Sequence, residues 1–204
     1  MAQQPVIVGR PALLVIDIQK SAFMEDVDKG IPIMPGYRGN MARARGVIEA
    51  ARAAGVPVIF IQEVHRPDFV DFGRELDGSE GVHCVEGRPG TYLAAEEMGM
   101  RANDYHVPKR RYSAFFGTDL EILLKGLKAE TLIMVGGMTD VCVHYSFVDG
   151  HQHDYHCRVV REAVGGTSVE AHEAALRAME YLQTGAVRPA AEIEAALAAH
   201  VAEV

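Results

Sequence analysis

Three side chains that could cooperate in catalysis follow segments with the composition of buried strands. Asp17 comes directly after the apolar residues 12–16, Lys109 after residues 105–107, and Cys142 after residues 131–135 and a Gly-Gly pair. A thiol can attack a carbonyl carbon when a base takes its proton, and a carboxylate can act as that base. A nearby lysine would stabilise the thiolate and orient the acid. Together the three residues predict nucleophilic catalysis by an Asp–Lys–Cys trio.

Each of the three also has an ordinary structural interpretation. Asp17 is typical of a turn at a strand exit, Lys109 of a solvated surface, and Cys142 of a small buried apolar side chain. Reactivity is favoured at Cys142 because we expect it in the first turn of a helix, where the helix dipole lowers the pKa of a thiol. The pair Gly136–Gly137 would let the backbone turn so that N–H groups face a developing oxyanion.

The elements that must position these side chains alternate along the chain. Short apolar runs predict strands buried on both faces, and segments of helical period lie between them. We therefore expect an α/β fold, a three-layer, Rossmann-like, doubly wound and mostly parallel sheet with helices on both faces. No repeat or linker divides the chain, so residues 1–204 are expected to form a single domain. The expected strands are residues 12–16, 58–61, 105–107, 131–135 and 157–160, and the expected helices are residues 41–54, 119–128, 141–151, 170–182 and 190–199.

The composition limits which cellular compartment and which classes of partner we expect. The 204 residues are 49% apolar and carry 20 Lys and Arg against 28 Asp and Glu, for a net charge of −8. This excludes a disordered or fibrous chain, and the acidic balance argues against nucleic acid or an anionic membrane as a partner. No apolar run approaches the ~20 residues of a membrane span, the N-terminus lacks a signal pattern, and three cysteines cannot all pair. We therefore expect a cytoplasmic protein that acts on a small molecule.

Residues 63–100 break the alternation of strands and helices. This segment holds six glycines, two prolines and two histidines, and it shows no clear helical or strand period. A loop this long within a compact domain is usually functional. We expect it to lie over the carboxyl ends of the strands, where open α/β sheets bind their ligands.

Three segments resemble the isochorismatase-like cysteine hydrolases, a group that includes nicotinamidases, N-carbamoylsarcosine amidases, biuret hydrolases and ureidoacrylate amidases. The matching segments are Leu-Val-Ile-Asp-Ile-Gln at 14–19, Lys-Arg-Arg-Tyr-Ser-Ala-Phe at 109–115 and Gly-Gly-Met-Thr-Asp-Val-Cys-Val at 136–143. The resemblance implies that Asp17 is the general base, Lys109 its partner and Cys142 the nucleophile. It also implies a homo-oligomer, for which closed symmetry favours a homodimer or homotetramer.

The same resemblance implies a reaction. It predicts a cis peptide between Gly137 and Met138 and an oxyanion hole formed by the N–H groups of Met138 and Cys142. Isochorismatases that hydrolyse vinyl ethers resemble the chain as well, but they lack the cysteine. Cys142 therefore favours hydrolysis of the C–N bond of a small amide or ureido substrate through a thioester, which requires no cofactor. Vinyl-ether hydrolysis and a non-catalytic binding protein on the same fold are the alternatives.

Three residues of the long loop resemble a metal site. Glu63, His65 and His83 stand where nicotinamidases carry metal ligands, and such a set would suit Zn, Mn or Fe. Two positions depart from that pattern, because Glu63 replaces an aspartate and Glu80-Gly81 replaces a Trp-Pro pair. The segment is equally similar to biuret hydrolases, which work without a metal. The alternative is that His65 and His83 hydrogen-bond the substrate or the loop itself.

Aromatic and basic residues near the strand ends are candidates for the substrate pocket. Phe23, Tyr112 and Phe115 could line it, although aromatic residues in such places also belong to cores. Arg110 and Arg111 could bind a substrate carboxylate, or they could form surface charges or ion pairs between subunits.

Overall fold

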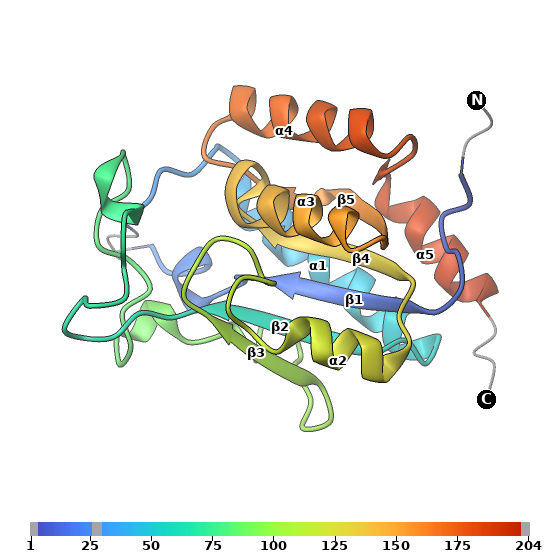
Figure 1. Cartoon of the computed structure of the whole chain (residues 1–204), viewed down its shortest axis with the longest axis horizontal. Coiled ribbons are helices and arrows are strands. Elements are labelled where there is room, and N and C mark those ends of the chain that lie inside the picture. The colour runs from blue at the N-terminus through green and yellow to red at the C-terminus, as the bar shows by residue number, and fades with distance from the viewer. Residues whose placement is uncertain (1–3, 26–29, 201–204) are drawn as a thin grey trace.

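Six parallel strands form one sheet at the centre of the protein (Figure 1). A computed structural model describes residues 4–25 and 30–200 of the chain. In this part the strands follow the order β3-β2-β1-β4-β5-β6, and every pair of neighbours is parallel. The expected doubly wound α/β fold is confirmed. The strands are β1 (Pro11–Ile16), β2 (Val58–Glu63), β3 (Tyr105–Lys109), β4 (Thr131–Gly137), β5 (His156–Gly165) and β6 (Val187–Arg188).

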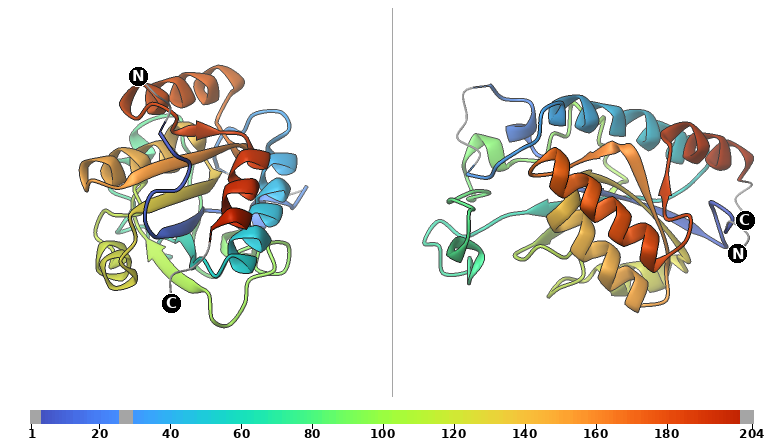
Figure 2. Two further views of the ribbon diagram at one scale, coloured as in Figure 1. Left: turned by 90° about the vertical axis from the view of Figure 1, so that its right-hand side faces the viewer. Right: turned by 90° about the horizontal axis from the view of Figure 1, so that it is seen from above.

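Helices cover both faces of this sheet, as Figure 2 shows in the view along the strands. Two of them, α1 and α5, lie on one face, and α2, α3 and α4 lie on the other. None of the helices in the described ranges is long and apolar enough to cross a membrane. The helices are α1 (Tyr37–Ala53), α2 (Leu120–Leu127), α3 (His144–Gln152), α4 (Val169–Leu182) and α5 (Ala190–Ala199).

The apolar run of β1 explains why this strand lies in the middle of the sheet. All six of its residues are buried. Leu13 and Val15 pack into the core under α1 and α5, whereas Leu14 and Ile16 pack into the core under α2, α3 and α4. Because successive side chains of a strand point to opposite faces, only a continuous apolar run can fill both cores.

Two helices begin more than one residue away from the start that the sequence predicts. Helix α1 begins at Tyr37 rather than at residue 41, directly after Gly36, whose φ of 82° is left-handed. Helix α3 begins at His144 rather than at residue 141, because residues 139–143 form a π-helical turn. Cys142 therefore lies just before α3 and not in the first turn of an α-helix.

The long connection between β2 and β3 extends from the carboxyl edge of the sheet (green in Figure 1). It contains two short 3-10 turns, Glu75–Asp77 and Pro89–Thr91, and is otherwise irregular. Strand β2 runs on to Glu63, so the irregular part begins one residue later than expected. An isolated parallel bridge between His65 and Val85 folds the connection back on itself beside the strand ends.

Gly136 permits the close approach of β4 and β1 at this edge. Its φ is +119°, and a Cβ atom there would lie 1.9 Å from the backbone oxygen of Ile16. We therefore expect Gly136→Ala to lower the free energy of unfolding by about 2 kcal/mol or more, since neither the backbone angle nor the space accepts a side chain. Urea denaturation measures this change.

Gly126 in α2 is the matched control for this substitution. A Cβ atom there would meet no other atom within 4 Å, and alanine favours a helix by about 0.5–1 kcal/mol over glycine. Gly126→Ala should therefore raise stability. Equal effects of the two substitutions would show that the approach of β4 to β1 does not depend on Gly136.

Candidate active site

The carboxyl ends of four neighbouring strands bring the predicted catalytic residues to one place. Asp17 directly follows β1, Glu63 ends β2, Lys109 ends β3, and Cys142 lies in the turn after β4. Glu63 and Lys109 are paired in the register of β2 and β3. Because β3, β2, β1 and β4 are adjacent in the sheet, their ends deliver these four side chains side by side.

The structure brings Asp17, Lys109 and Cys142 together around one buried ammonium group. Lys109 Nζ lies 2.9 Å from Asp17 Oδ2 and 3.5 Å from Cys142 Sγ. Asp17 has a left-handed φ of 50°, and its Oδ1 accepts a hydrogen bond of 2.7 Å from the backbone N–H of Glu63. The strand exit thus points the carboxylate back across the sheet edge, towards the lysine and the thiol.

Glu63 is a second carboxylate on the same ammonium group. Its Oε2 forms an ion pair with Lys109 Nζ and lies 3.5 Å from Cys142 Sγ. The sequence pattern groups Glu63 with the histidines alone and does not reveal this contact. The signal that could have revealed it is the strand register, because Glu63 and Lys109 both end their strands, side by side in the sheet.

Burial controls the protonation of the trio. Burial raises the pKa of Asp17 to about 6 against the opposing effect of Lys109, and Glu63 adds to the rise. Burial also raises the pKa of the Cys142 thiol well above its usual value, with Asp17 and Glu63 adding to this and Lys109 opposing it. The expectation of a lowered thiol pKa at Cys142 is therefore wrong. A buried thiol facing two carboxylates stays protonated unless a base takes its proton.

Lys109 keeps its charge in spite of complete burial. Burial alone would lower its pKa, but Asp17, Cys142 and Glu63 outweigh this and raise the pKa well above its usual value. A buried ammonium group is tolerated only with such partners. The interpretation of Lys109 as a solvated surface cation is therefore wrong.

A cavity opens beside the trio and gives a substrate access to Cys142. It encloses about 570 Å³ including its mouth, and its walls include Asp17, Met138 and Cys142. The peptide between Gly137 and Met138 is cis, as the family resemblance implied. The apolar wall of the cavity comes from Ala22, Ile31, Ile33, Tyr37 and Val141.

Of the three aromatic residues proposed for this pocket, only Tyr112 lines it among the described residues. Phe23 packs instead against the core under α1 and α5. Phe115 packs against the opposite core and stacks on His153, with ring centroids 5.4 Å apart. Both rings are partly buried and pack against the cores instead of lining the cavity.

Arg110 and Arg111 do not line the cavity either, within the part of the chain that the structure describes. The Arg110 guanidinium contacts the backbone oxygen of Val64 and lies 3.4 Å from Asp71 Oδ2. Arg111 donates to the backbone oxygens of Asp71 and Arg110. Both arginines therefore hold the connection between β2 and β3 against the sheet.

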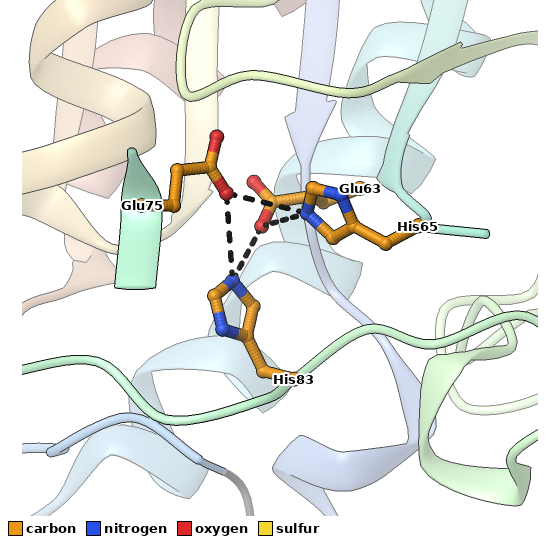
Figure 3. A group of neighbouring side chains, drawn as sticks. All are labelled: Glu63, His65, Glu75 and His83. Carbon is orange, nitrogen blue, oxygen red and sulfur yellow. Dashed lines mark hydrogen bonds and ion pairs between the residues drawn. The ribbon is translucent and has the colours of Figure 1, made fainter. Parts of the chain in front are cut away.

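Two histidines and two glutamates lie close together, as Figure 3 shows, and two of them, Glu63 and His83, belong to the cavity wall. His83 Nε2 is 2.8 Å from Glu63 Oε1 and 3.9 Å from Glu75 Oε2. His65 Nε2 is 3.5 Å from Glu63 Oε1 and 3.3 Å from Glu75 Oε2. Glu75 was not predicted, since a single acid in an irregular loop gives no pattern that reveals its burial. We call these four residues the His–Glu cluster.

The facing atoms of the His–Glu cluster are close enough together to share one divalent cation. Ligands about 2.0–2.2 Å from a tetrahedral centre are separated from one another by about 3.3–3.6 Å. The two separations from His65 Nε2 fall in this range, and those from His83 Nε2 lie on either side of it. Within the described ranges, both ring nitrogens of His65 and both carboxylate oxygens of Glu75 are buried without a hydrogen-bond partner. His83 Nδ1 lies 2.7 Å from the backbone oxygen of Gly81, so an Nδ1–H donating there leaves Nε2 free to bind a cation. The residues fit such an ion.

The alternative to a bound cation is that His65 and His83 are protonated and carry the positive charge themselves. Burial opposes the charge on His65, but the adjacent carboxylates of Glu63 and Glu75 outweigh it and raise the pKa to about 9. The pKa of His83 is raised as well, mainly by Glu63 against the effect of burial. His65 is fully buried and is not part of the described cavity wall, so of the two histidines only His83 reaches the substrate space.

Comparisons with known proteins agree with this geometry. Residues 11–192 match the isochorismatase domain. The chain is 34% identical to the maleamate amidohydrolase of Pseudomonas putida over 173 residues, which cover 82% of this chain and 78% of that enzyme. It is 32% identical to the ureidoacrylate amidohydrolase RutB of Rhizobium rhizogenes over 161 residues, which cover 71% of this chain and 65% of the relative's length.

The fold is shared with solved structures. The pyrazinamidase of Pyrococcus horikoshii, solved in complex with zinc, superimposes with a TM-score of 0.74 at 24% identity, over 89% of this chain and 98% of that one.

The two sequence relatives are amidohydrolases, which hydrolyse C–N bonds other than peptide bonds. Since the domain match spans all six strands and reaches into α5, the chain belongs to the isochorismatase family, as its sequence resemblance implied.

Proposed function

We propose that this protein is a cysteine-dependent amidohydrolase that cleaves the C–N bond of a small amide or ureido compound. The observation that carries the proposal is the position of Lys109 Nζ, within 3.5 Å of both a carboxylate oxygen of Asp17 and the sulfur of Cys142 at the wall of a cavity. The activities of the two named relatives support it.

In this proposal Asp17 moves one proton through the reaction. Its carboxylate takes the proton of Cys142, and the thiolate attacks the substrate carbonyl to form a tetrahedral oxyanion. The backbone N–H groups of Met138 and Cys142 stabilise that oxyanion. When the C–N bond breaks, Asp17 gives its proton to the leaving amine or ammonia. Asp17 then takes a proton from water, which attacks the thioester and releases the acid product and the Cys142 thiol.

Lys109 makes these proton transfers favourable. Its ammonium group lies beside both the donor and the acceptor of the proton, so it stabilises the negative charge wherever this resides. Glu63 balances the same ammonium group from its other side. The trio and Glu63 together carry one positive charge and two carboxylates. This balance keeps the thiol protonated until Asp17 takes its proton.

The His–Glu cluster is a site for a divalent cation such as Zn²⁺, Mn²⁺ or Fe²⁺ in this proposal. Glu63, His65, Glu75 and His83 would hold the ion, which when bound would polarise the substrate carbonyl or position water. Glu63 connects the two parts of the site, since its Oε1 faces the histidines and its Oε2 faces Lys109. Its two oxygens therefore orient the cluster and the catalytic ammonium group together.

Replacement of the nucleophile tests the proposed reaction. We expect Cys142→Ala to lower kcat/KM for amide hydrolysis at least about a thousandfold, because no other group can form the thioester. Ammonia release from a panel of amides and ureas measures the activity. Mass spectrometry of the intact protein with a slow substrate should show an acyl adduct that Cys142→Ala lacks.

Cys157→Ala is the control, because Cys157 is buried in the core away from the cavity walls. It should leave kcat/KM close to that of the wild type, even if it lowers the melting temperature. Turnover by Cys142→Ala near the wild-type rate would refute the cysteine mechanism. A correctly folded wild type that hydrolyses no amide or urea would favour a binding protein or a vinyl-ether hydrolase.

The proposed base predicts the pH dependence of the reaction. The pKa of Asp17 is raised to about 6, so its carboxylate is the main form above that pH and the carboxylic acid the main form below it. We expect kcat/KM to fall about tenfold for each pH unit below pH 6. Rates between pH 4.5 and 8, with circular dichroism to exclude unfolding, measure this limb. Constant kcat/KM down to pH 5 would contradict a base of this pKa.

Metal content tests the His–Glu cluster. Elemental analysis of the freshly purified protein should find a divalent metal near one per chain, and Glu75→Gln should weaken zinc binding, measured against a competing chelator, at least about a hundredfold. Glu86→Gln is the control, because Glu86 is an exposed acid of the same connection. Less than a tenth of a metal per chain, with full activity after EDTA dialysis, would leave the protonated histidines as the occupants.

A further inference from the structure

The charged residues in the cavity wall are dominated by carboxylates. Among the described residues, the side chains there that can carry charge at neutral pH are Asp17, Glu63, Glu80 and His83. His83 is the only one of them that can be cationic, and both of its ring nitrogens are engaged, Nδ1 with the backbone oxygen of Gly81 and Nε2 with Glu63. The wall therefore offers a bound anion no free cationic partner in the described part of the chain.

The nearby cations are occupied as well. The ammonium group of Lys109 is completely buried behind the wall, where it contacts Asp17, Glu63 and Cys142. Arg110 and Arg111 are bound to the connection between β2 and β3. None of these three side chains offers a substrate carboxylate a free cation.

Glu80 is the acid in this wall that the catalytic machinery does not use. Its Oε2 accepts a hydrogen bond of 3.0 Å from the hydroxyl of Tyr112, whose ring stacks on Tyr145 with centroids 5.8 Å apart. This contact fixes the carboxylate in the wall, and a carboxylate has room for further donors. Burial raises the pKa of Glu80 against the effects of the Tyr112 hydroxyl and of His83, and the carboxylates of Glu63 and Glu75 add to the rise.

The His–Glu cluster does not compensate Glu80. Its two glutamates are balanced by two protonated imidazoles, or by one divalent cation with neutral imidazoles, so its net charge is zero in either state. With Glu63 counted in the cluster, the single positive charge of Lys109 is balanced by Asp17. The carboxylate of Glu80 is therefore left to interact with whatever enters the cavity.

We infer that Glu80 selects substrates whose end remote from the scissile amide is a neutral N–H donor or a cation, and that it rejects a carboxylate at that end. The inference rests on the proposed amidohydrolase function and specifies its substrate class. It separates this protein from both named relatives, because maleamate and ureidoacrylate each carry a carboxylate. The physical reason is that like charges repel strongly in a partly dehydrated space, whereas a donor group satisfies the free acceptors of Glu80.

Three amides on one two-methylene frame test the selection. Succinamate ends in a carboxylate, succinamide in a neutral carboxamide and β-alaninamide in an ammonium group. We expect kcat/KM for succinamide and β-alaninamide to exceed that for succinamate at least about tenfold, after allowance for the two equivalent amides of succinamide. Glu80→Gln should reduce this preference at least about fivefold, and Glu80→Arg should reverse it.

Two variants separate the charge of Glu80 from its surroundings. Tyr112→Phe removes the hydrogen bond but keeps the carboxylate, so the preference should persist. Glu86→Gln removes an exposed negative charge of the same connection and should leave the three kcat/KM values unchanged. Preference for succinamate in the wild type, or an unchanged order in Glu80→Gln, would overturn the inference while leaving the amidohydrolase function intact.

Binding without turnover keeps the two proposals distinct. The dissociation constants of the three amides for Cys142→Ala, measured by ligand-observed NMR, should follow the same order, with succinamate the weakest. If the wild type hydrolyses none of the three and this order holds, the substrate class stands and the hydrolytic mechanism is at fault. Tightest binding of succinamate would refute the substrate class, whatever the turnover.

Discussion

The buried ammonium group of Lys109 is the interaction on which the rest of the site depends. A charge removed completely from water is stable only with close, oppositely charged partners. Asp17 and Glu63 supply them, and they do so because β1, β2 and β3 are neighbours that end at the same edge of the sheet. The same group contacts the sulfur of Cys142 after β4. The order of the strands therefore determines which side chains can surround this ammonium group.

Glu63 extends that constraint to the His–Glu cluster. One of its oxygens contacts Lys109 and the other faces His65 and His83, so the state of the imidazoles is coupled to the ammonium group through a single carboxylate. Glu75 completes the group from a separate turn of the long connection. The bend of this connection, where His65 pairs with Val85, is what brings the four residues within reach of one another.

The strands and the connection contribute different parts of the function. The strand ends hold the reacting groups in fixed positions, as expected of a rigid scaffold. The connection supplies Glu80 and His83 to the wall of the cavity, where the remote end of a substrate would lie. An excess of carboxylates there favours neutral or cationic compounds, so relatives with the same trio can differ in substrate through this one segment.

The sequence alone determined the fold class and the trio. Continuous apolar runs mark strands buried on both faces, and residues that directly follow parallel strands must meet at one edge, which is why Asp17, Lys109 and Cys142 were found together. Only the tertiary structure decided the contact of Glu63 with Lys109, the membership of Glu75 in the His–Glu cluster and the packing of Phe23 and Phe115 against the cores. It also reversed the expected pKa shift of Cys142. These features depend on how an irregular connection folds back and on how deeply each group is buried, and neither leaves a periodic trace in the sequence.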